Sequence, residues 1–528
     1  MSWTFGERVQ HFLQVLVPRL LLALFRMVSP GRSGRPKRLP LIRNPLLTLS
    51  AAQLAQKIRR REVTSVEVVQ AYIDRIQEVN PLLNAIVKDR FSSALLEAAQ
   101  ADKKIEEKGG EDVLKHQFPL LGVPITVKES FSLQGMPNAA GLISRANTIS
   151  SVDAPVVGLL KRAGAIPIGV TNTSELCMWL ESNNHLYGIT NNPYNLERIA
   201  GGSSGGEGSI IGGGASVIGL GSDIGGSIRL PSFFNGIFGH KGTRGVVSND
   251  GQMPEFSGLH DDFVSTGPMC RYAEDLLPLM KIMAGPNADK LSLSQKVDLR
   301  KLRYFTVVDD GGSHLTTAVD NQLIEAQKRV VASFEADLGV TVKQVSFPQL
   351  KYAFQIWDTF LALPDKDGKP CTPFVELMAE GRSVWLVWEV IKRIFGRSEH
   401  TVAAIGLALY EKTHSKVPSQ FILRQKEELQ REMDELLGTD GVLLYPSHPF
   451  IAPKHHHPLF IPSNVAYTGI MNILGLPVTQ CPLGLSKEQL PLGVQVVAGK
   501  FQDRLTMAVA LYLEKTFGGW RDPGVSDD

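Results

Sequence analysis

Three serines in one glycine-rich stretch are the residues of this chain best suited to nucleophilic chemistry. The stretch spans residues 201–232 and reads GGSSGGEGSIIGGGASVIGLGSDIGGSIRLPS. Its candidate nucleophiles are Ser203, Ser204 and Ser227. A serine hydroxyl is a weak nucleophile until a neighbouring base takes its proton. The sequence must therefore also supply a base, and the many glycines need a reason of their own.

Two common motifs explain this stretch poorly. Ser203 fits the G-x-S-x-G pattern of an α/β-hydrolase, but that pattern is weak where glycine is so frequent. Such a site also needs a downstream histidine, and His240, His448 and the run 455–457 offer no diagnostic spacing. The patterns G-x-x-x-x-G-K-[ST] and G-x-G-x-x-G are both absent, so the sequence does not predict a nucleotide site.

Lys128 is the candidate base because it ends the apolar segment GVPITVK. We expect a buried strand within residues 118–130 that ends at this lysine. Burial disfavours the charged ammonium, lowers the lysine pKa and can leave a neutral amine. Such a base can activate a serine directly or through a relay hydroxyl. Glycine gives the backbone the freedom that this relay needs, and it lets N–H groups converge on an oxyanion.

The elements that must position these groups alternate between helix and strand. Helices are predicted within 48–81, with Ser50 as N-cap and Pro81 as a stop, and over 93–110. Residues 153–172 read as helix, turn and strand, which is the alternation of an α/β fold. An inserted αβ lobe is expected from the strands and helix at 301–308, 318–339 and 340–347. Returning strands and a last helix are predicted at 440–449, 477–484, 490–499 and 504–519.

Composition excludes several classes of protein. Lysine plus arginine (55) nearly balances aspartate plus glutamate (53), which gives no general case for a nucleic-acid partner. The four cysteines form no CxxC pair, so neither a disulfide framework nor a zinc site is expected. The adjacent histidines 455–457 cannot all face one metal. We therefore expect no metal and no cofactor.

The sequence resembles the amidase signature family, whose members hydrolyse amides with a Ser–cis-Ser–Lys triad. The resemblance rests on the stretch from residue 201 to GHKGT at 239–243, and on GVPITVKES, TNTSEL, YPSHP and LPLGVQVVAG, which occur in the family's order. It extends from about Leu47 to the C-terminus. It implies an α/β fold with a large mixed β-sheet core surrounded by helices. The segment NNPYNLERIAGGSSGGEG and the hydrophobic N-terminus are similar to the fatty-acid amide hydrolase branch.

The resemblance also implies a role for each matching residue. Lys128 would be the base, Ser203 the relay that follows a cis peptide from Gly202, and Ser227 the nucleophile. The backbone N–H groups of the oxyanion hole would be those of Ile224, Gly225, Gly226 and Ser227.

Further positions around the triad follow from the same match. Asp223 and Arg229 would fix the loop that carries the nucleophile, and Ser204 would be a structural hydroxyl bonded to the backbone. Gly242 departs from the family, which has proline there. The change loosens a turn behind the site and touches no triad member.

The N-terminus differs from the rest of the chain. Residues 11–28 are apolar and precede a cluster of basic residues. No cleavage site of a signal peptide follows them, and Pro18 and Arg19 interrupt a membrane-spanning helix. Arg8, Arg19 and Arg26 share one side of a helix, which suits a helix lying in the membrane interface. We expect a membrane-anchoring segment and linker at 1–46 and a catalytic domain at 47–528, with spanning or interfacial attachment left open.

A second apolar stripe occurs within residues 383–412. Val384, Trp385, Trp388 and Ile391 share one helix face, and basic residues stand close by. The stripe suits a core helix, but tryptophan beside basic residues also suits a membrane contact. In fatty-acid amide hydrolases this region is a hydrophobic cap at the substrate entrance, so both interpretations stay open.

The resulting hypothesis is a serine hydrolase that cleaves long-chain fatty acid amides through an acyl-enzyme. Its substrates would be primary amides and N-acylethanolamines, and its other partner would be membrane lipid, with a homodimer left open. It would reside on intracellular membranes or lipid-droplet surfaces. The alternatives are an amidotransferase-type amidase subunit, which would be soluble, and a catalytically silent membrane scaffold, which would lack a triad residue.

Overall fold

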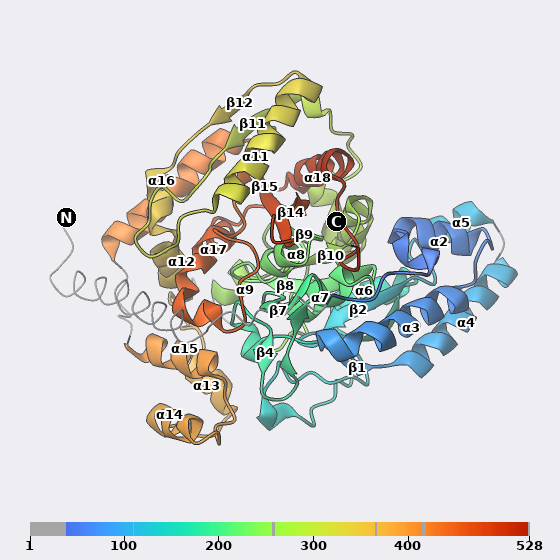
Figure 1. Ribbon diagram of the computed structural model, residues 1–528, viewed down its shortest axis with the longest axis horizontal. Helices are drawn as coiled ribbons and strands as arrows, with labels where there is room; N and C mark the ends of the chain where they lie inside the picture. The colour runs from blue at the N-terminus through green and yellow to red at the C-terminus, as the bar shows by residue number, and fades with distance from the viewer. Residues whose placement is uncertain (1–37, 109, 256–258, 365–366, 414–418, 526–528) are drawn as a thin grey trace.

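A mixed sheet of eleven strands runs through the centre of the molecule, and helices surround it (Figure 1). The computed structural model describes residues 38–108, 110–255, 259–364, 367–413 and 419–525. The strand order is β1-β3-β2-β8-β10-β9-β14-β15-β13-β11-β12. This arrangement confirms the α/β fold with a large mixed sheet that the sequence predicts.

The strands of this sheet are short, and those at its centre are buried on both faces. Their bounds are β1 (Ile86–Asp89), β2 (Pro124–Lys128), β3 (Ile166–Thr171), β8 (Ile218–Asp223), β9 (Phe238–Lys241), β10 (Ser265–Cys270), β11 (Arg303–Thr306), β12 (Val342–Gln344), β13 (Gly441–Tyr445), β14 (Val478–Leu485) and β15 (Pro491–Ala498). Every residue of β2, β3, β8 and β10 is buried. Strands β3, β2 and β8 pair in parallel, which explains their continuous runs of apolar and small residues.

Two hairpins lie outside the large sheet. They join β4 (Asn183–Asn184) to β5 (Gly188–Ile189) and β6 (Asn191–Asn192) to β7 (Asn195–Ile199).

The predicted inserted lobe is wrong in one respect, because its strands extend the main sheet. Strand β11 pairs in parallel with β13 on one side and with β12 on the other. The helix that connects β11 to β12 is α11 (Asn321–Ser333). A βαβ unit added at a sheet edge keeps its backbone groups paired with the sheet, so it needs no core of its own.

The helices begin and end close to where the sequence places them. Ser50 caps its helix through a capping box with Gln53, as predicted, whereas Pro81 lies inside a helix that continues to Leu83. The bounds not yet given are α2 (Ala51–Arg59), α3 (Ser65–Leu83), α4 (Phe91–Lys108), α5 (Glu111–Gln117), α6 (Pro155–Arg162), α7 (Gly205–Gly212), α8 (Arg229–Phe234), α9 (Leu259–Phe263), α10 (Leu276–Ala284), α12 (Ala353–Leu361), α13 (Phe374–Ala379), α14 (Leu386–Ile394), α15 (Val402–Thr413), α16 (Gln420–Leu437), α17 (Ala466–Leu474) and α18 (Asp503–Phe517).

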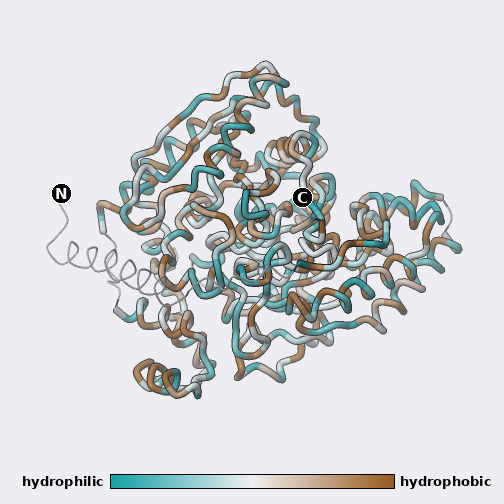
Figure 2. The backbone as a smooth tube through the Cα atoms, viewed as in Figure 1, coloured by the Kyte–Doolittle hydropathy of each residue, from teal (hydrophilic) through white to brown (hydrophobic). Residues whose placement is uncertain are grey.

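Helices α13, α14 and α15 form a small lobe at one side of the molecule (Figure 1). The lobe has its own hydrophobic cluster, which Leu142 and Leu176 of the main body complete. Helix α14 is apolar along much of its length (Figure 2), yet Trp385 and Trp388 are 75% and 55% exposed. The interpretation of this stripe as a core helix is therefore wrong.

The two predicted membrane contacts differ in what the structure says of them. The segment 11–28 lies outside the described residues. Among the helices in the described part of the chain, none has the length and apolar composition that a bilayer span requires. Residues from 38 onward contact the main body: Leu39 is buried, and the Pro40 carbonyl accepts a hydrogen bond from Arg75 at 2.8 Å.

Candidate active site

Lys128 ends β2, which lies between β3 and β8 in the sheet, and its side chain is fully buried. Its Nζ lies 2.7 Å from Ser203 Oγ and 3.0 Å from Ser222 Oγ, and both contacts are hydrogen bonds. Ser222 reaches the lysine because β8 pairs with β2 in a register that sets Leu220 opposite Val127. The sequence analysis missed Ser222, since only the strand pairing brings it to Lys128.

The environment of Lys128 lowers the pKa of its amine. Burial lowers the pKa of Lys128, while neighbouring Cys177, Asp223 and Glu207 act in the opposite direction without reversing the shift. Burial also raises the pKa of the Glu207 carboxyl to about 8, so this group is largely protonated at neutral pH and offers the lysine little negative charge. Cys177 is a second neighbour of the lysine that the sequence analysis did not identify.

Glu207 is held in place by two threonine hydroxyls. Thr126 on β2 and Thr171 on β3 donate hydrogen bonds to its two carboxyl oxygens at 2.6 Å and 2.8 Å. All three side chains are fully buried. Glu207 therefore ties helix α7 to the two strands beside it, immediately next to the candidate base.

Ser203 lies in the turn between β7 and α7, and the peptide bond that joins it to Gly202 is cis, at the position that the resemblance implies. Gly202 has no room for a side chain, because a Cβ atom would lie 2.3 Å from the carbonyl oxygen of Trp179. The Ser203 carbonyl accepts a hydrogen bond from Ser182 Oγ at 2.9 Å. Close backbone packing thus explains this glycine and fixes the serine beside Lys128.

Ser204 contacts the backbone of the neighbouring loops. Its N–H donates to the Ser227 carbonyl at 3.2 Å, and its hydroxyl donates to the Ser222 carbonyl at 3.4 Å. No side-chain hydrogen bond caps helix α7 at this residue. These contacts suit a structural role for Ser204.

Ser227 precedes helix α8 and is the most accessible of the three predicted triad residues. It is 9% exposed, whereas Lys128 and Ser203 are 0% and 1% exposed. Within the described residues, the structure records no hydrogen bond between the hydroxyls of Ser203 and Ser227. The first link of the relay is therefore formed and the second is open. Catalytic hydrogen bonds of unliganded enzymes often tighten only when substrate binds.

The loop before Ser227 is organised around the Asp223 carboxylate. Its oxygens accept hydrogen bonds from the N–H groups of Gly226 and Ile228 at 2.7 Å and 3.1 Å. The Arg229 guanidinium forms a bidentate ion pair with it at 3.0 Å and 2.9 Å, and both side chains are fully buried. Burial alone would raise the pKa of Asp223, but Arg229 holds it well below its usual range.

Arg229 extends this network to two distant elements. Its Nη atoms donate to Gln495 Oε1 on β15 and to Asn472 Oδ1 on α17, each at 2.6 Å. A buried charged pair persists only when further hydrogen bonds satisfy both partners. The contacts of Asp223 and Arg229 hold together the loop that precedes Ser227, β15 and α17.

The backbone N–H groups of residues 224–227 differ in whether a protein acceptor is recorded for them within the described ranges. The Gly226 N–H donates to the Asp223 carboxylate at 2.7 Å, although the resemblance assigns it to the oxyanion hole. For the N–H groups of Ile224, Gly225 and Ser227, no acceptor is recorded within the described part of the chain. A Cβ atom on Gly226, whose φ is +126°, would lie 2.2 Å from Thr468 Oγ1, so only glycine fits.

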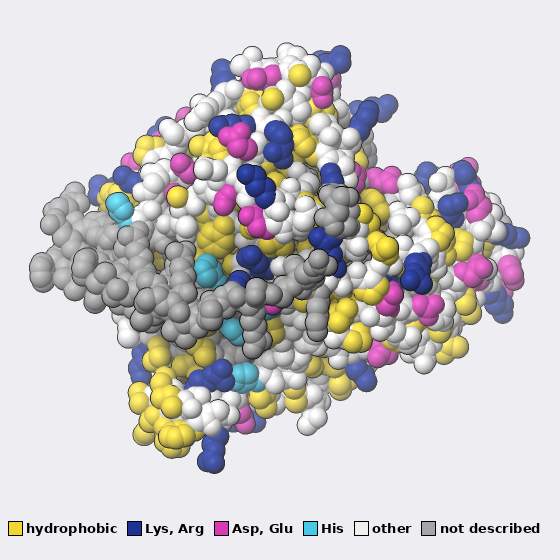
Figure 3. All heavy atoms as spheres, viewed as in Figure 1, with side chains coloured by type: hydrophobic (Ala, Val, Ile, Leu, Met, Phe, Trp, Pro, Cys, Tyr) yellow, Lys and Arg dark blue, Asp and Glu magenta, His cyan; other side chains and the backbone are white. Residues whose placement is uncertain are grey.

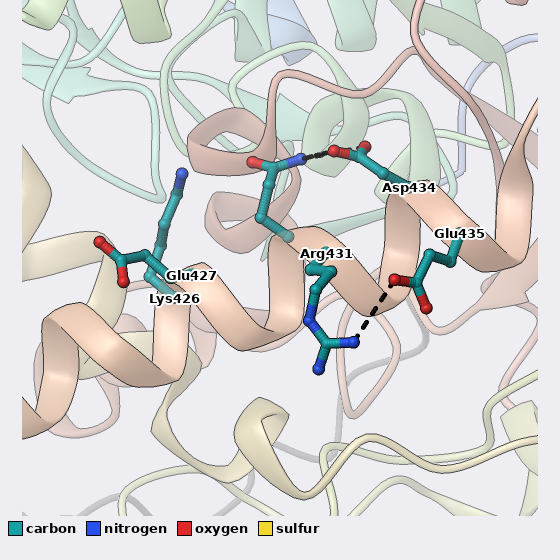
Figure 4. Close-up of a pocket in the computed structure, with 6 residues that line it drawn as sticks. Lys426, Glu427, Arg431, Asp434 and Glu435 are labelled. Carbon is teal, nitrogen blue, oxygen red and sulfur yellow. Dashed lines mark hydrogen bonds and ion pairs between the residues drawn. The ribbon is translucent and has the colours of Figure 1, made fainter.

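A shallow groove on the outer face of α16 is a separate feature (Figure 4). Its lining residues are Lys426, Glu427, Gln430, Arg431, Asp434 and Glu435. They all belong to one helix, and Gln430 bonds to Asp434 while Arg431 bonds to Glu435. The groove contains none of the groups described above, and we do not assign the substrate to it.

Comparisons with known proteins agree on one family. The profile of the family described as Amidase matches residues 67–507. A relative from Danio rerio, fatty-acid amide hydrolase 2-B, is 77% identical over 526 residues, which are 99% of this chain and 100% of that protein. Fatty-acid amide hydrolase 2 from Homo sapiens is 53% identical over 535 residues, which cover 99% of this chain and 100% of that protein. A solved structure described as fatty acid amide hydrolase has a TM-score of 0.71 at 22% identity, covering 94% of this chain and 89% of that one, and shows the shared fold.

We predict that a fluorophosphonate modifies Ser227 and neither of the other two candidate serines. Ser227 is the most exposed of the three, and within the described ranges no acceptor is recorded for its own N–H or for those of Ile224 and Gly225 before it. Mass spectrometry of the peptides after labelling locates the adduct, with Ser227→Ala as the control. An adduct on Ser203 or Ser204 in the unmodified chain would contradict the assignment.

We predict that Lys128→Ala loses most of the amidase activity and that wild-type activity rises with pH. The pKa of Lys128 is lowered by burial, and the amine must lose its proton before it can accept one. Loss of a general base costs on the order of 10²–10⁴-fold in rate. The half-buried Lys161 pairs with Asp153 away from the triad, so Lys161→Ala serves as the control. Unchanged turnover of the Lys128 variant at alkaline pH would refute the proposed base.

Proposed function

The chain belongs to the amidase signature family, and we propose that it is a serine hydrolase that cleaves long-chain fatty acid amides to a fatty acid and an amine. Primary amides and N-acylethanolamines are the proposed substrates. The observation that carries the chemistry is the 2.7 Å contact between the fully buried Lys128 Nζ and Ser203 Oγ. Support for the substrate class comes from the names of the full-length relatives.

The first half of the proposed reaction acylates Ser227. The neutral Lys128 amine takes the proton of the Ser203 hydroxyl while Ser203 Oγ takes the proton of Ser227. Ser227 Oγ then bonds to the amide carbonyl carbon, and the C=O electron pair moves to the oxygen. The free N–H groups of Ile224, Gly225 and Ser227 stabilise that oxyanion. The C–N bond breaks as the proton returns from Lys128 through Ser203 to the leaving nitrogen.

The second half regenerates the enzyme. The departing amine leaves room for a water molecule, whose proton passes through Ser203 to Lys128 as its oxygen bonds to the acyl carbon. The bond between Ser227 Oγ and the acyl carbon then breaks, and Ser227 Oγ recovers a proton from the relay. Ser222 orients the Lys128 side chain in both halves of the reaction. When the neutral Lys128 amine donates a hydrogen bond to Ser222 Oγ, its lone pair can turn toward Ser203.

Helix α14 supports a membrane-associated enzyme. Figure 3 shows hydrophobic side chains gathered over this helix, with basic side chains next to them. Trp385, Ile394 and Phe395 are each about three-quarters exposed, and Arg393 and Arg397 are exposed beside them. Tryptophan with arginine on one amphipathic helix suits the interface of a lipid surface. We propose that α14 contacts lipid and that the N-terminal segment 11–28 provides the anchor.

The lipid-facing lobe lies next to the proposed catalytic residues. The turn Glu175–Cys177 joins them, because Glu175 accepts a hydrogen bond from the Thr401 N–H at the start of α15 at 2.8 Å. Leu176 enters the hydrophobic cluster of the lobe, and Cys177 neighbours Lys128. An amide with a long acyl chain gains about 0.8 kcal/mol for each CH₂ kept out of water. Entry of substrate from the lipid beside α14 avoids that cost.

A panel of amides tests the proposed substrate class. We predict that the full-length chain hydrolyses oleamide and N-oleoylethanolamine with a higher kcat/KM than acetamide or butyramide. Ser227→Ala is the control for each compound. Glutamine should release no ammonia, because that activity belongs to the amidotransferase alternative. Preference for short amides, or ammonia release from glutamine alone, would overturn the proposal.

Two changes test the proposed lipid contacts. Removal of residues 1–37 should release much of the protein from membranes and leave turnover of a short soluble amide unchanged. In that truncated chain, Trp385→Ser with Trp388→Ser should abolish residual binding to liposomes and slow long-chain amides selectively. The measurements are flotation with phospholipid vesicles and kcat/KM for a short and a long substrate.

The matched control for the two tryptophans is Leu96→Ser with Val113→Ser. These two side chains are also exposed, but they lie on α4 and α5, at the opposite side of the molecule from α14 (Figure 1). The control should bind vesicles like the truncated chain. Equal loss of activity on short and long substrates by the folded tryptophan variant would refute the role of α14.

A further inference from the structure

The carbonyl groups of the loop before Ser227 each accept a hydrogen bond. The Asp223 carbonyl accepts from Asn472 Nδ2 at 2.8 Å, and the Gly226 carbonyl accepts from the Leu230 N–H at 2.7 Å. The two carbonyls between them are bonded by side chains of α12 and α17. The indole Nε1 of Trp357 donates to Ile224 at 3.1 Å, and Thr468 Oγ1 donates to Gly225.

Holding a carbonyl also aims the N–H group of the next residue. A trans peptide is planar, so its C=O and N–H bonds point in opposite directions. The peptide bonds of this loop are trans, since the two cis bonds recorded among the described residues lie elsewhere. The bond from Trp357 to the Ile224 carbonyl therefore directs the Gly225 N–H to the opposite side, where no protein acceptor is recorded for it within the described ranges.

Two glycines make room for the Trp357 indole. A Cβ atom on Gly225 would lie 3.1 Å from its Cζ2, and one on Gly469 would lie 2.6 Å from its Cδ1. Neither glycine has the positive φ that would by itself require glycine. Gly469 lies inside helix α17, where glycine costs about 1 kcal/mol relative to alanine. Close contact with the indole accounts for a glycine at this position.

We propose that Trp357 is a positioning residue of the oxyanion hole. Its N–H fixes the Ile224–Gly225 peptide, and this peptide directs the Gly225 N–H toward the developing oxyanion. The inference rests on the proposed amide hydrolysis, because it assigns a role in that same reaction. Trp357 is half-buried and its ring packs beside Phe354, so its N–H can be removed while apolar packing is retained.

Asn472 and Thr468 are less suitable for this test. Asn472 also accepts from Arg229 and donates to the Asp223 carboxylate, so its replacement would disturb the buried ion pair. Thr468 Oγ1 also lies 3.1 Å from the Val465 carbonyl. Among the described residues, the Trp357 side chain makes one hydrogen bond, to the Ile224 carbonyl, so a change there alters one link of the loop.

The test is Trp357→Phe in the full-length chain, which keeps an aromatic ring and removes the donor. Loss of a direct oxyanion donor costs about 10²–10³-fold in kcat, and loss of a positioning bond should cost less, about 10-fold. KM should change by less than about 2-fold, because the bond acts in the transition state. Affinity for a trifluoromethyl ketone, which forms a tetrahedral adduct with serine, should fall in parallel with kcat. Affinity for the fatty acid product should stay the same.

A second variant displaces the indole without altering it. Gly469→Ala places a methyl group against Cδ1 of Trp357 and should lower kcat by a similar factor. If both changes act through the same bond, the double variant should lose little more than either single variant. Fully additive losses would show that the two residues act independently and would overturn the inference.

Several outcomes distinguish the inference from the proposed function. An unchanged kcat for Trp357→Phe, with amide hydrolysis intact, overturns the role of Trp357 and leaves the function standing. Equal losses of affinity for the ketone and the fatty acid would make Trp357 a substrate-packing residue instead. No hydrolysis of any amide by the wild-type chain would contradict the function itself. If Trp357→Phe fails to fold, benzothienylalanine at position 357 keeps the bicyclic shape, lacks the N–H and decides the same question.

Discussion

The complete burial of one lysine side chain is the constraint on which the rest of the structure depends. Lys128 stands at the end of a strand that two parallel neighbours enclose, and its side chain is fully buried. Transfer of a charged ammonium to such a place costs several kcal/mol, so the neutral amine is favoured. The Glu207 carboxyl does not reverse this preference, because burial raises its own pKa to about 8. The Asp223 carboxylate acts in the opposite direction, but the pKa of Lys128 is still lowered. These two shifts together support the proposal that Lys128 is a buried base.

The buried Asp223 carboxylate keeps its charge, because charged and polar donors surround it. Asp223 has Arg229 as a bidentate partner and three backbone N–H groups as further donors, so its pKa falls. The pair holds the nucleophile loop from behind, while α12 and α17 hold its carbonyls from outside. Few of these partners are close in sequence, since Gln495 lies 266 positions from Arg229. The geometry of the proposed oxyanion hole therefore depends on tertiary packing.

Sequence patterns predicted the parts of the site that local rules determine. An apolar run that ends in lysine predicts a buried strand, and Lys128 stands at the end of β2. Ser222 was missed because its approach to Lys128 depends on the register of β8. Trp357 was missed because its partner, the Ile224 carbonyl, lies 133 positions away. Helix α14 left two interpretations open, since core and lipid-facing helices share one apolar periodicity. Exposure of Trp385 distinguishes them only in the folded chain.

The protonation state of Lys128 is the central claim, and neutron diffraction measures it most directly. Crystals of the full-length chain exchanged into D₂O at neutral pH would show the deuterons on Nζ. The account predicts two deuterons on Lys128 Nζ, with the lone pair directed at Ser203 Oγ, and three on an exposed lysine such as Lys103 in the same crystal. Three deuterons on Lys128 Nζ would contradict the account, because an ammonium has no lone pair with which to start the proton relay.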